Sequence, residues 1–231
     1  MYYKNEQAVG EGIARASATV PREALFITTK LWHTDLGYDA ALRGFDTSMK
    51  LLGLDVLDLY LIHWPVPSRG LYLETWRALE RLHAEKRVRA IGVSNFTRPC
   101  LEHLLQEAEV KPVLNQIELH PWLPQADLRA LHQAQGLVTQ SWSSLAQGQL
   151  LTEPTVQRIA ERRGKSPAQV LLRWGLEQGN AVLFRSIVPE RLASNQQLFD
   201  WELSTQDLQE LAALACDKRM GPDPDVYGRP K

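Results

Sequence analysis

Short apolar strands that alternate with helical segments constrain the fold of this chain more than any other feature. Six runs of aliphatic and β-branched residues lack the period-two alternation of strands that face water on one side. Such runs are typical of parallel strands covered on both faces. The predicted strands are Leu25–Leu31, Leu57–Trp64, Arg89–Asn95, Leu114–Leu119, Leu137–Trp142 and Ala181–Ile187.

The segments between these strands carry helix signals. Apolar residues recur at helical spacing between Leu71 and Leu82. Residues 166–169, with the sequence SPAQ, form a predicted capping box with proline at the first helical position, and Gly53 ends a helix that begins near Asp39. Alternating strands and helices predict a parallel sheet, closed or open.

Composition limits the function classes. The 231 residues, 44% of them hydrophobic, can bury one sizeable core, and without a linker segment we expect a single domain over residues 1–231. The formal net charge of −1, with acidic and basic residues interspersed, predicts no binding to nucleic acid or to an anionic membrane. Two cysteines without paired Cys/His spacing predict neither a disulfide framework nor a metal site.

The sequence shows no pattern typical of a targeting segment or of a phosphate-binding loop. The first residues lack the basic-then-apolar pattern of a signal peptide, and no apolar run is long enough to span a bilayer. Neither G-x-G-x-x-G nor G-K-[ST] occurs, which disfavours a Rossmann turn and a P-loop. We therefore expect a soluble protein of the reducing cytoplasm.

Polar and aromatic side chains end the predicted strands, where the chemistry of parallel α/β folds collects. Each has a plainer interpretation when taken alone. A lysine at a strand end can be a solvated cap, a histidine can be a core imidazole, a tryptophan can serve packing, and Ser94-Asn95 can be an ordinary turn. Their joint placement on one rim favours a functional site. These residues are Lys30, His63, Ser94, Asn95, Gln116 and Trp142.

Several segments resemble the aldo-keto reductases, and they occur in that family's order over essentially the whole chain. The resemblance is nearest to the bacterial 2,5-diketo-D-gluconate reductase type. It implies a (β/α)8 TIM barrel that binds NADPH extended across its C-terminal rim without a Rossmann domain. The segments are YKNEQAVGEGI at 3–13, FITTKLW at 26–32, DLYLIHWP at 58–65, IGVSNF at 91–96, NQIELHP at 115–121, SWSSLAQG at 141–148 and KRMGPDPD at 218–225.

The resemblance implies three catalytic residues. Tyr3 matches the general acid that protonates the carbonyl oxygen, and His63 matches the histidine that orients and polarises the carbonyl. Lowering a phenol pKa from about 10 to about 7 requires roughly 4 kcal/mol of differential stabilisation, which the ammonium of Lys30 can supply in a water-poor site. Trp32 and Trp64 resemble apolar walls of the substrate pocket, although both also fit plain packing.

The resemblance also assigns the cofactor-binding residues. Ser94, Asn95 and Gln116 match groups that bind the nicotinamide carboxamide, and Trp142 matches the aromatic residue that stacks on the nicotinamide ring. The backbone N–H groups of a loop can donate hydrogen bonds to a pyrophosphate. The remaining matches are Ser143, Leu145, Gln147 and Gly148 beside the pyrophosphate, and Arg185, Ser186, Arg191 and Asn195 at the adenosine end.

Arg185 and Arg191 bear on the choice of cofactor. Two arginines facing a 2′-phosphate would form charge-assisted bonds and favour NADPH over NADH. Without the resemblance, both fit a solvated helix start equally well. The family's Pro-Lys before the serine reads Phe184-Arg185 here, which keeps the charge but changes the pair that sets this preference.

The beginning of the chain departs from the family pattern. The family places an aspartate in an Asp-Thr-Ala strand end before the tyrosine, and its first two strands and first helix have no counterpart here. We expect a barrel of this type lacking those elements, with two unpaired edges. Lys30 would lose its carboxylate partner, and such a buried ammonium tends to lose its proton. Our hypothesis is that Met1 is internal to a longer reading frame; the alternative is a truncated paralogue.

Three functional interpretations follow. The favoured one is a monomeric NADPH-dependent reductase of small carbonyl compounds: keto sugar acids such as 2,5-diketo-D-gluconate, α-dicarbonyls such as methylglyoxal, and β-keto esters. The second is a catalytically impaired NADPH-binding module, since the barrel family also supplies redox-sensing regulatory subunits. The third is a non-functional fragment.

Overall fold

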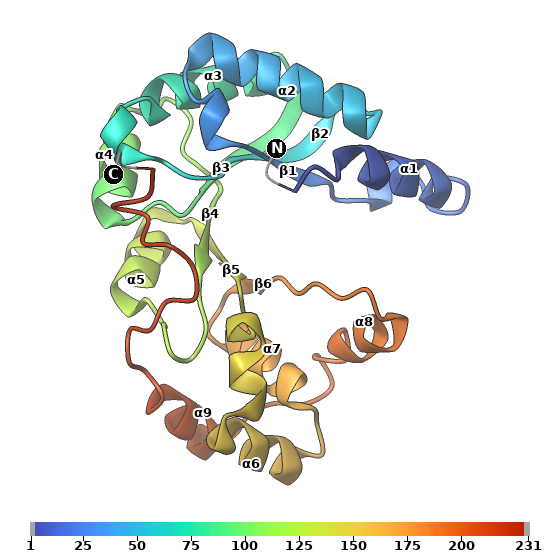
Figure 1. Cartoon of the computed structure of the whole chain (residues 1–231), viewed down its shortest axis with the longest axis vertical. Coiled ribbons are helices and arrows are strands. Elements are labelled where there is room, and N and C mark those ends of the chain that lie inside the picture. The colour runs from blue at the N-terminus through green and yellow to red at the C-terminus, as the bar shows by residue number, and fades with distance from the viewer. Residues whose placement is uncertain (1–2, 229–231) are drawn as a thin grey trace. The chain divides into compact units, whose positions relative to one another are not determined.

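The computed structural model describes residues 3–228. They contain a six-stranded sheet whose strand order follows the sequence (Figure 1). The strands are β1 Thr28–Leu31, β2 Leu57–Ile62, β3 Val88–Ser94, β4 Leu114–Glu118, β5 Val138–Trp142 and β6 Ala181–Val182. The α-helices are α1 Glu6–Ala16, α2 Tyr38–Leu52, α3 Tyr72–Ala84, α4 Arg98–Glu107, α5 Ala126–Gln135, α6 Pro154–Arg163, α7 Pro167–Glu177, α8 Pro189–Asn195 and α9 Thr205–Ala212. Short 3-10 helices lie at Arg22–Ala24, His33–Asp35, Pro67–Arg69 and Ala146–Thr152.

The described residues divide into two compact units. The first unit comprises residues 3–115 with 224–228, and the second comprises residues 116–223. The expectation of a single domain stays a prediction.

The first unit is built on β1, β2 and β3, which pair in parallel. Figure 1 shows α2 and α3 side by side along these strands. Every residue of β2 is buried, and Leu59 and Leu61 form an apolar cluster with Leu114. Because alternate residues of a strand share a face, and Lys30 pairs with Leu61, the side chains of Lys30 and Leu61 project from the same face of the sheet.

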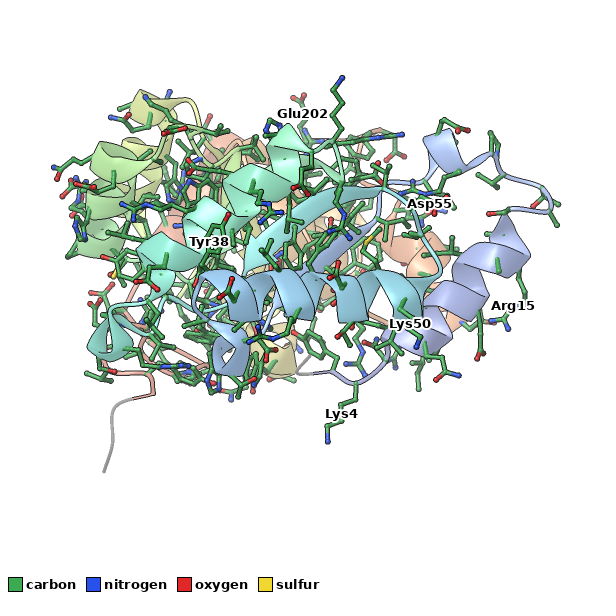
Figure 2. The ribbon with its side chains drawn as sticks, turned by 90° about the horizontal axis from the view of Figure 1, so that it is seen from above. Lys4, Arg15, Tyr38, Lys50, Asp55 and Glu202 are labelled. Atoms are coloured by element: carbon green, nitrogen blue, oxygen red, sulfur yellow. The ribbon has the colours of Figure 1, made fainter. Side chains whose placement is uncertain are left out.

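Local sequence signals account for the helix ends. Gly53 takes a left-handed conformation at φ 65°, and its N–H bonds to the carbonyl of Met49, so α2 ends where predicted. The capping box at Ser166 and Gln169 is present at the start of α7, as predicted. Figure 2 shows α2 running from Tyr38 to Lys50, with Asp55 in the connection to β2.

Two predicted strands were too long by three residues or more. The prediction of 25–31 was wrong before Thr28, because the N–H of Ile27 bonds to the carboxylate of Asp58 at 2.8 Å. The prediction of 181–187 was wrong beyond Val182. There the apolar run leaves the sheet, and Leu183 and Ile187 are 41% and 89% exposed.

The second unit carries β5, β6 and the helices α5 to α9. β5 and β6 pair in parallel, with Gln140 opposite Ala181. The helix α7 packs against α6, α8 and β6. Among residues 3–228, no helix is long and apolar enough to cross a membrane.

Candidate active site

Three residues predicted to act in catalysis line one cavity in the first unit. Tyr3, Lys30 and His63 contribute to a cavity of about 160 Å³ whose wall also includes Asn5 and Thr28. The Tyr3 and His63 ring centroids lie 6.0 Å apart, and the Nζ atom of Lys30 lies 5.4 Å from the Tyr3 ring centroid. Tyr3 is 55% exposed, so a ligand can reach its ring from solvent.

The start of α1 is bound to the edge strand next to Lys30. Glu6, the first residue of α1, is buried and accepts a hydrogen bond from the hydroxyl of Thr29 at 2.7 Å. Thr29 directly precedes Lys30 in β1, and Glu6 follows Tyr3 by three residues. This bond therefore fixes the short segment that carries Tyr3 beside the strand that carries Lys30.

The cavity disfavours positive charge on the histidine. Burial, followed by the nearby charges of Lys30 and His33, lowers the pKa of His63 to about 3, so its imidazole is neutral near neutral pH. Burial also lowers the pKa of Lys30. Among residues 3–228, no carboxylate forms an ion pair with Lys30. A neutral imidazole can orient a carbonyl through a hydrogen bond without adding charge.

Aromatic side chains surround His63. Trp32 meets it edge to face at 5.1 Å between centroids, and Trp64 lies parallel to it at 6.4 Å. Tyr227 stacks on Trp64 at 4.2 Å and meets the edge of His33 at 5.4 Å. The structure thus brings both predicted pocket tryptophans next to the predicted histidine. The sequence analysis did not predict His33 or Tyr227. No local pattern indicates that Tyr227, near the C-terminus, contacts His33 and Trp64, which are remote in sequence.

Ser94 and Asn95 lie at the end of β3 and belong to the same unit. Both are buried, and Asn95 has a left-handed backbone at φ 60°. Its side-chain amide donates to the carbonyl of His63 at 2.9 Å and to the hydroxyl of Ser94 at 3.1 Å. These bonds join the two strand ends directly.

The second unit holds the predicted residues from Gln116 onward. Gln116 is buried in β4 and donates to Gln140 at 2.6 Å, while Trp142 is half-buried at the end of β5. In the loop after Trp142, left-handed backbone conformations occur at Ser143, Ala146, Gln147 and Gly148. Alternating right- and left-handed residues can turn backbone N–H groups toward an anion. Here the N–H groups of Ala146 and Gly148 bond to the carbonyls of Ser143 and Leu145 within the loop.

The predicted adenosine residues surround the start and end of α8. Arg185 and Arg191 are exposed, whereas Asn195 is buried. The hydroxyl of Ser186 accepts from the N–H of Val188 at 3.0 Å, which orders the turn into α8. The structure therefore leaves both arginine side chains accessible to a ligand from solvent.

A buried carboxylate in the second unit was also missed. Glu118 in β4 is 1% exposed, and it accepts hydrogen bonds from the backbone N–H groups of Met220 and Gly221. His120 Nε2 lies 3.0 Å from the same carboxylate. Both partner segments are within motifs of the family resemblance, but no local signal assigns them a contact. Among the described residues, no cluster of three or more His, Cys, Asp or Glu could hold a metal ion.

The chain is similar to known proteins in both sequence and structure. The sequence profile of the Aldo/keto reductase family matches residues 1–215. An aldo-keto reductase of Mycolicibacterium smegmatis is 50% identical over 225 residues, covering 97% of this chain and 81% of the relative. A glyoxal reductase of Bacillus subtilis is 49% identical over 223 residues, covering 96% and 79%. A crystal structure of a Gox0644 mutant in complex with NADPH superposes with a TM-score of 0.93 at 43% identity, covering 99% of this chain and 82% of that one.

Proposed function

The chain belongs to the aldo/keto reductase family, and we propose that it reduces small aldehydes and ketones to alcohols with NADPH as the cofactor. The observation that carries this proposal is the grouping of Tyr3, Lys30 and His63 around one cavity. The relatives support it, because one is named for glyoxal reduction and another was crystallised with NADPH.

In the proposed mechanism, NADPH supplies the hydride and the protein supplies the proton. Tyr3 donates its phenolic proton to the carbonyl oxygen as the carbon is reduced. Lys30, whose Nζ lies 5.4 Å from the centre of the Tyr3 ring, favours the phenolate through its charge. Neutral His63 hydrogen-bonds the carbonyl oxygen and orients it toward Tyr3.

Each unit carries residues that the family resemblance assigns to the cofactor. In the first unit, Ser94 and Asn95 would bind the nicotinamide carboxamide. In the second unit, the resemblance assigns Gln116 to the carboxamide, and the half-buried ring of Trp142 would stack on the nicotinamide. The remaining proposed contacts are Ser143, Leu145, Gln147 and Gly148, whose loop has left-handed backbone, and Arg185, Ser186, Arg191 and Asn195, which include two exposed cations for a 2′-phosphate.

The proposed substrates are small carbonyl compounds. Trp32 and Trp64 beside His63 offer apolar walls, and His63 and Tyr3 offer hydrogen-bond donors for one oxygen. α-Dicarbonyls such as glyoxal and methylglyoxal are the first choice, because a relative 49% identical is named glyoxal reductase. Keto sugar acids such as 2,5-diketo-D-gluconate and β-keto esters are the next compounds to test.

The decisive experiment compares Tyr3→Phe with Tyr38→Phe. NADPH consumption with methylglyoxal and the affinity for NADPH are measured for both variants. Tyr3→Phe should lower turnover on the order of 10²- to 10⁴-fold, since a general acid contributes about that much, and should leave NADPH affinity unchanged. Tyr38, at the start of α2, is the matched control and should keep wild-type turnover. Equal turnover by both variants would exclude Tyr3 as the acid.

A binding module without turnover is the second candidate, favoured by one observation. The lowered pKa of Lys30 means that its amine loses charge more readily, and a neutral amine would not stabilise a phenolate. The same assay separates the two candidates, because this module would bind NADPH and consume none with any carbonyl compound.

A further inference from the structure

We propose that Glu118 and Gly221 position the indole ring of Trp142 for the nicotinamide, by fastening the segment around Met220 to the end of β4. This inference rests on the proposed function, since it concerns the ring on which the cofactor would stack. Both are positioning residues, because they would act through Trp142. All the residues concerned lie in the second unit.

The Glu118 carboxylate is the anchor. It is 1% exposed and receives hydrogen bonds from the N–H of Met220, from the N–H of Gly221 at 3.0 Å, and from His120 Nε2 at 3.0 Å. Burial raises the pKa of this carboxyl, but the bonds from His120 and the two backbone groups outweigh burial, and the pKa is lowered overall. A buried, charged acceptor with three donors holds its partners more firmly than a neutral one.

Gly221 is the point of contact with the ring. A Cβ atom at this position would lie 2.5 Å from Cη2 and 3.3 Å from Cζ3 of Trp142, and 3.2 Å from Oε2 of Glu118. The backbone at Gly221 therefore packs directly against the six-membered part of the indole, and only glycine fits there. Trp142 is half-buried, so this contact defines where the ring stands at the end of β5.

The segment before Gly221 is also tied to the neighbouring loop. Gln147 Nε2 donates to the carbonyl of Met220 at 3.2 Å, and Lys218 Nζ donates to Gln149 at 2.9 Å. Lys218 further lies over the ring of Trp122, 4.1 Å from its centroid. One segment near the C-terminus thus holds both the Trp142 ring and the loop with left-handed backbone that follows it.

The test uses two ligands that differ at the nicotinamide end. Adenosine 2′,5′-bisphosphate carries the adenosine end of NADPH alone, so a displaced Trp142 ring should affect NADPH only. Gly221→Ala should weaken NADPH binding roughly 5- to 10-fold, on the scale of losing good ring stacking, and leave bisphosphate binding unchanged. Equal weakening of both ligands, or of neither, would overturn the proposal.

A double-mutant cycle tests the contact itself. Trp142→Phe removes the ring atoms that a Cβ at position 221 would meet, so Gly221→Ala should cost little NADPH affinity in that background. A full effect in the Trp142→Phe background would mean that Gly221 does not act through the ring.

Glu118→Gln provides a second route in case Gly221→Ala does not fold. Its matched control is Glu177→Gln, because Glu177 also accepts a backbone bond within the second unit, from the N–H of Leu203 at 2.8 Å. Only Glu118→Gln should weaken NADPH relative to the bisphosphate. Failure of the wild-type chain to bind NADPH would count against the proposed function, whereas wild-type binding with no effect of Gly221→Ala or Glu118→Gln would count against this inference alone.

Discussion

His63 should make the folded chain less stable as the pH falls from about 7 to about 5. Its ordinary pKa is 6.5, and burial beside Lys30 and His33 lowers it to about 3. Between these two values the unfolded chain takes up a proton at His63 and the folded chain does not. Stability therefore falls as pH falls through the unfolded pKa, and it continues to fall until the folded pKa is reached.

The magnitude follows from the pKa values. At about pH 5 the imidazole of the unfolded chain is 1.5 pH units below its ordinary pKa, while folded His63 is still neutral. Each unit corresponds to about 1.4 kcal/mol, so the free energy of unfolding should drop by about 2 kcal/mol because of this residue. His63→Gln keeps a polar side chain without the titration, and it should lose about 2 kcal/mol less than the wild type over the same interval.

The assay is denaturant unfolding followed by tryptophan fluorescence at about pH 7 and about pH 5, for the wild type and for His63→Gln. Taking the difference between the two proteins cancels the other titrating groups. The reasoning is refuted if both proteins lose the same free energy between the two pH values, because His63 would then be protonated in the folded chain.

Other residues give further expected outcomes. Burial and the charge of Arg129 lower the pKa of His132 to about 4, so His132→Gln should likewise lose about 2 kcal/mol less than the wild type from pH 7 to pH 5 in the same assay. Leu61→Ala removes a fully buried side chain and should destabilise the fold by about 3 kcal/mol, seen as a lower denaturation midpoint. Ser166→Ala should cost about 1 kcal/mol, measured in the same way, because it removes the side-chain half of the capping box of α7. Replacing Arg185 by alanine should weaken NADPH binding roughly 10-fold and leave NADH binding unchanged in parallel titrations; equal weakening of both would exclude a contact with the 2′-phosphate.

Local sequence patterns predict the helices and strands well because their causes are local. The end of α2 depends on the left-handed conformation of Gly53, and the start of α7 on a bond between side chain and backbone three residues apart. The strand ends are less predictable, since pairing partners decide them. Leu183 and Ile187 continue an apolar run, yet the chain leaves the sheet before them.

The residues of the candidate site also differ in whether the sequence could predict them. Lys30 and His63 stand at predicted strand ends, the family resemblance adds Tyr3, and the structure brings all three to one cavity. Tyr227 and Gly221 could not be assigned, because their contacts with Trp64 and Trp142 join segments remote in sequence. Such contacts depend on the path of the C-terminal segment, which carries no periodic pattern.

The loop after β5 concentrates unfavourable backbone geometry. Ser143, Ala146 and Gln147 each hold a left-handed conformation without being glycine, at φ 54°, 47° and 53°. Such conformations cost free energy that the rest of the fold must supply. A selection for thermostable variants should therefore return glycine or asparagine at these three positions. Those variants should bind NADPH more weakly, because a loop without this strain is no longer held in one conformation.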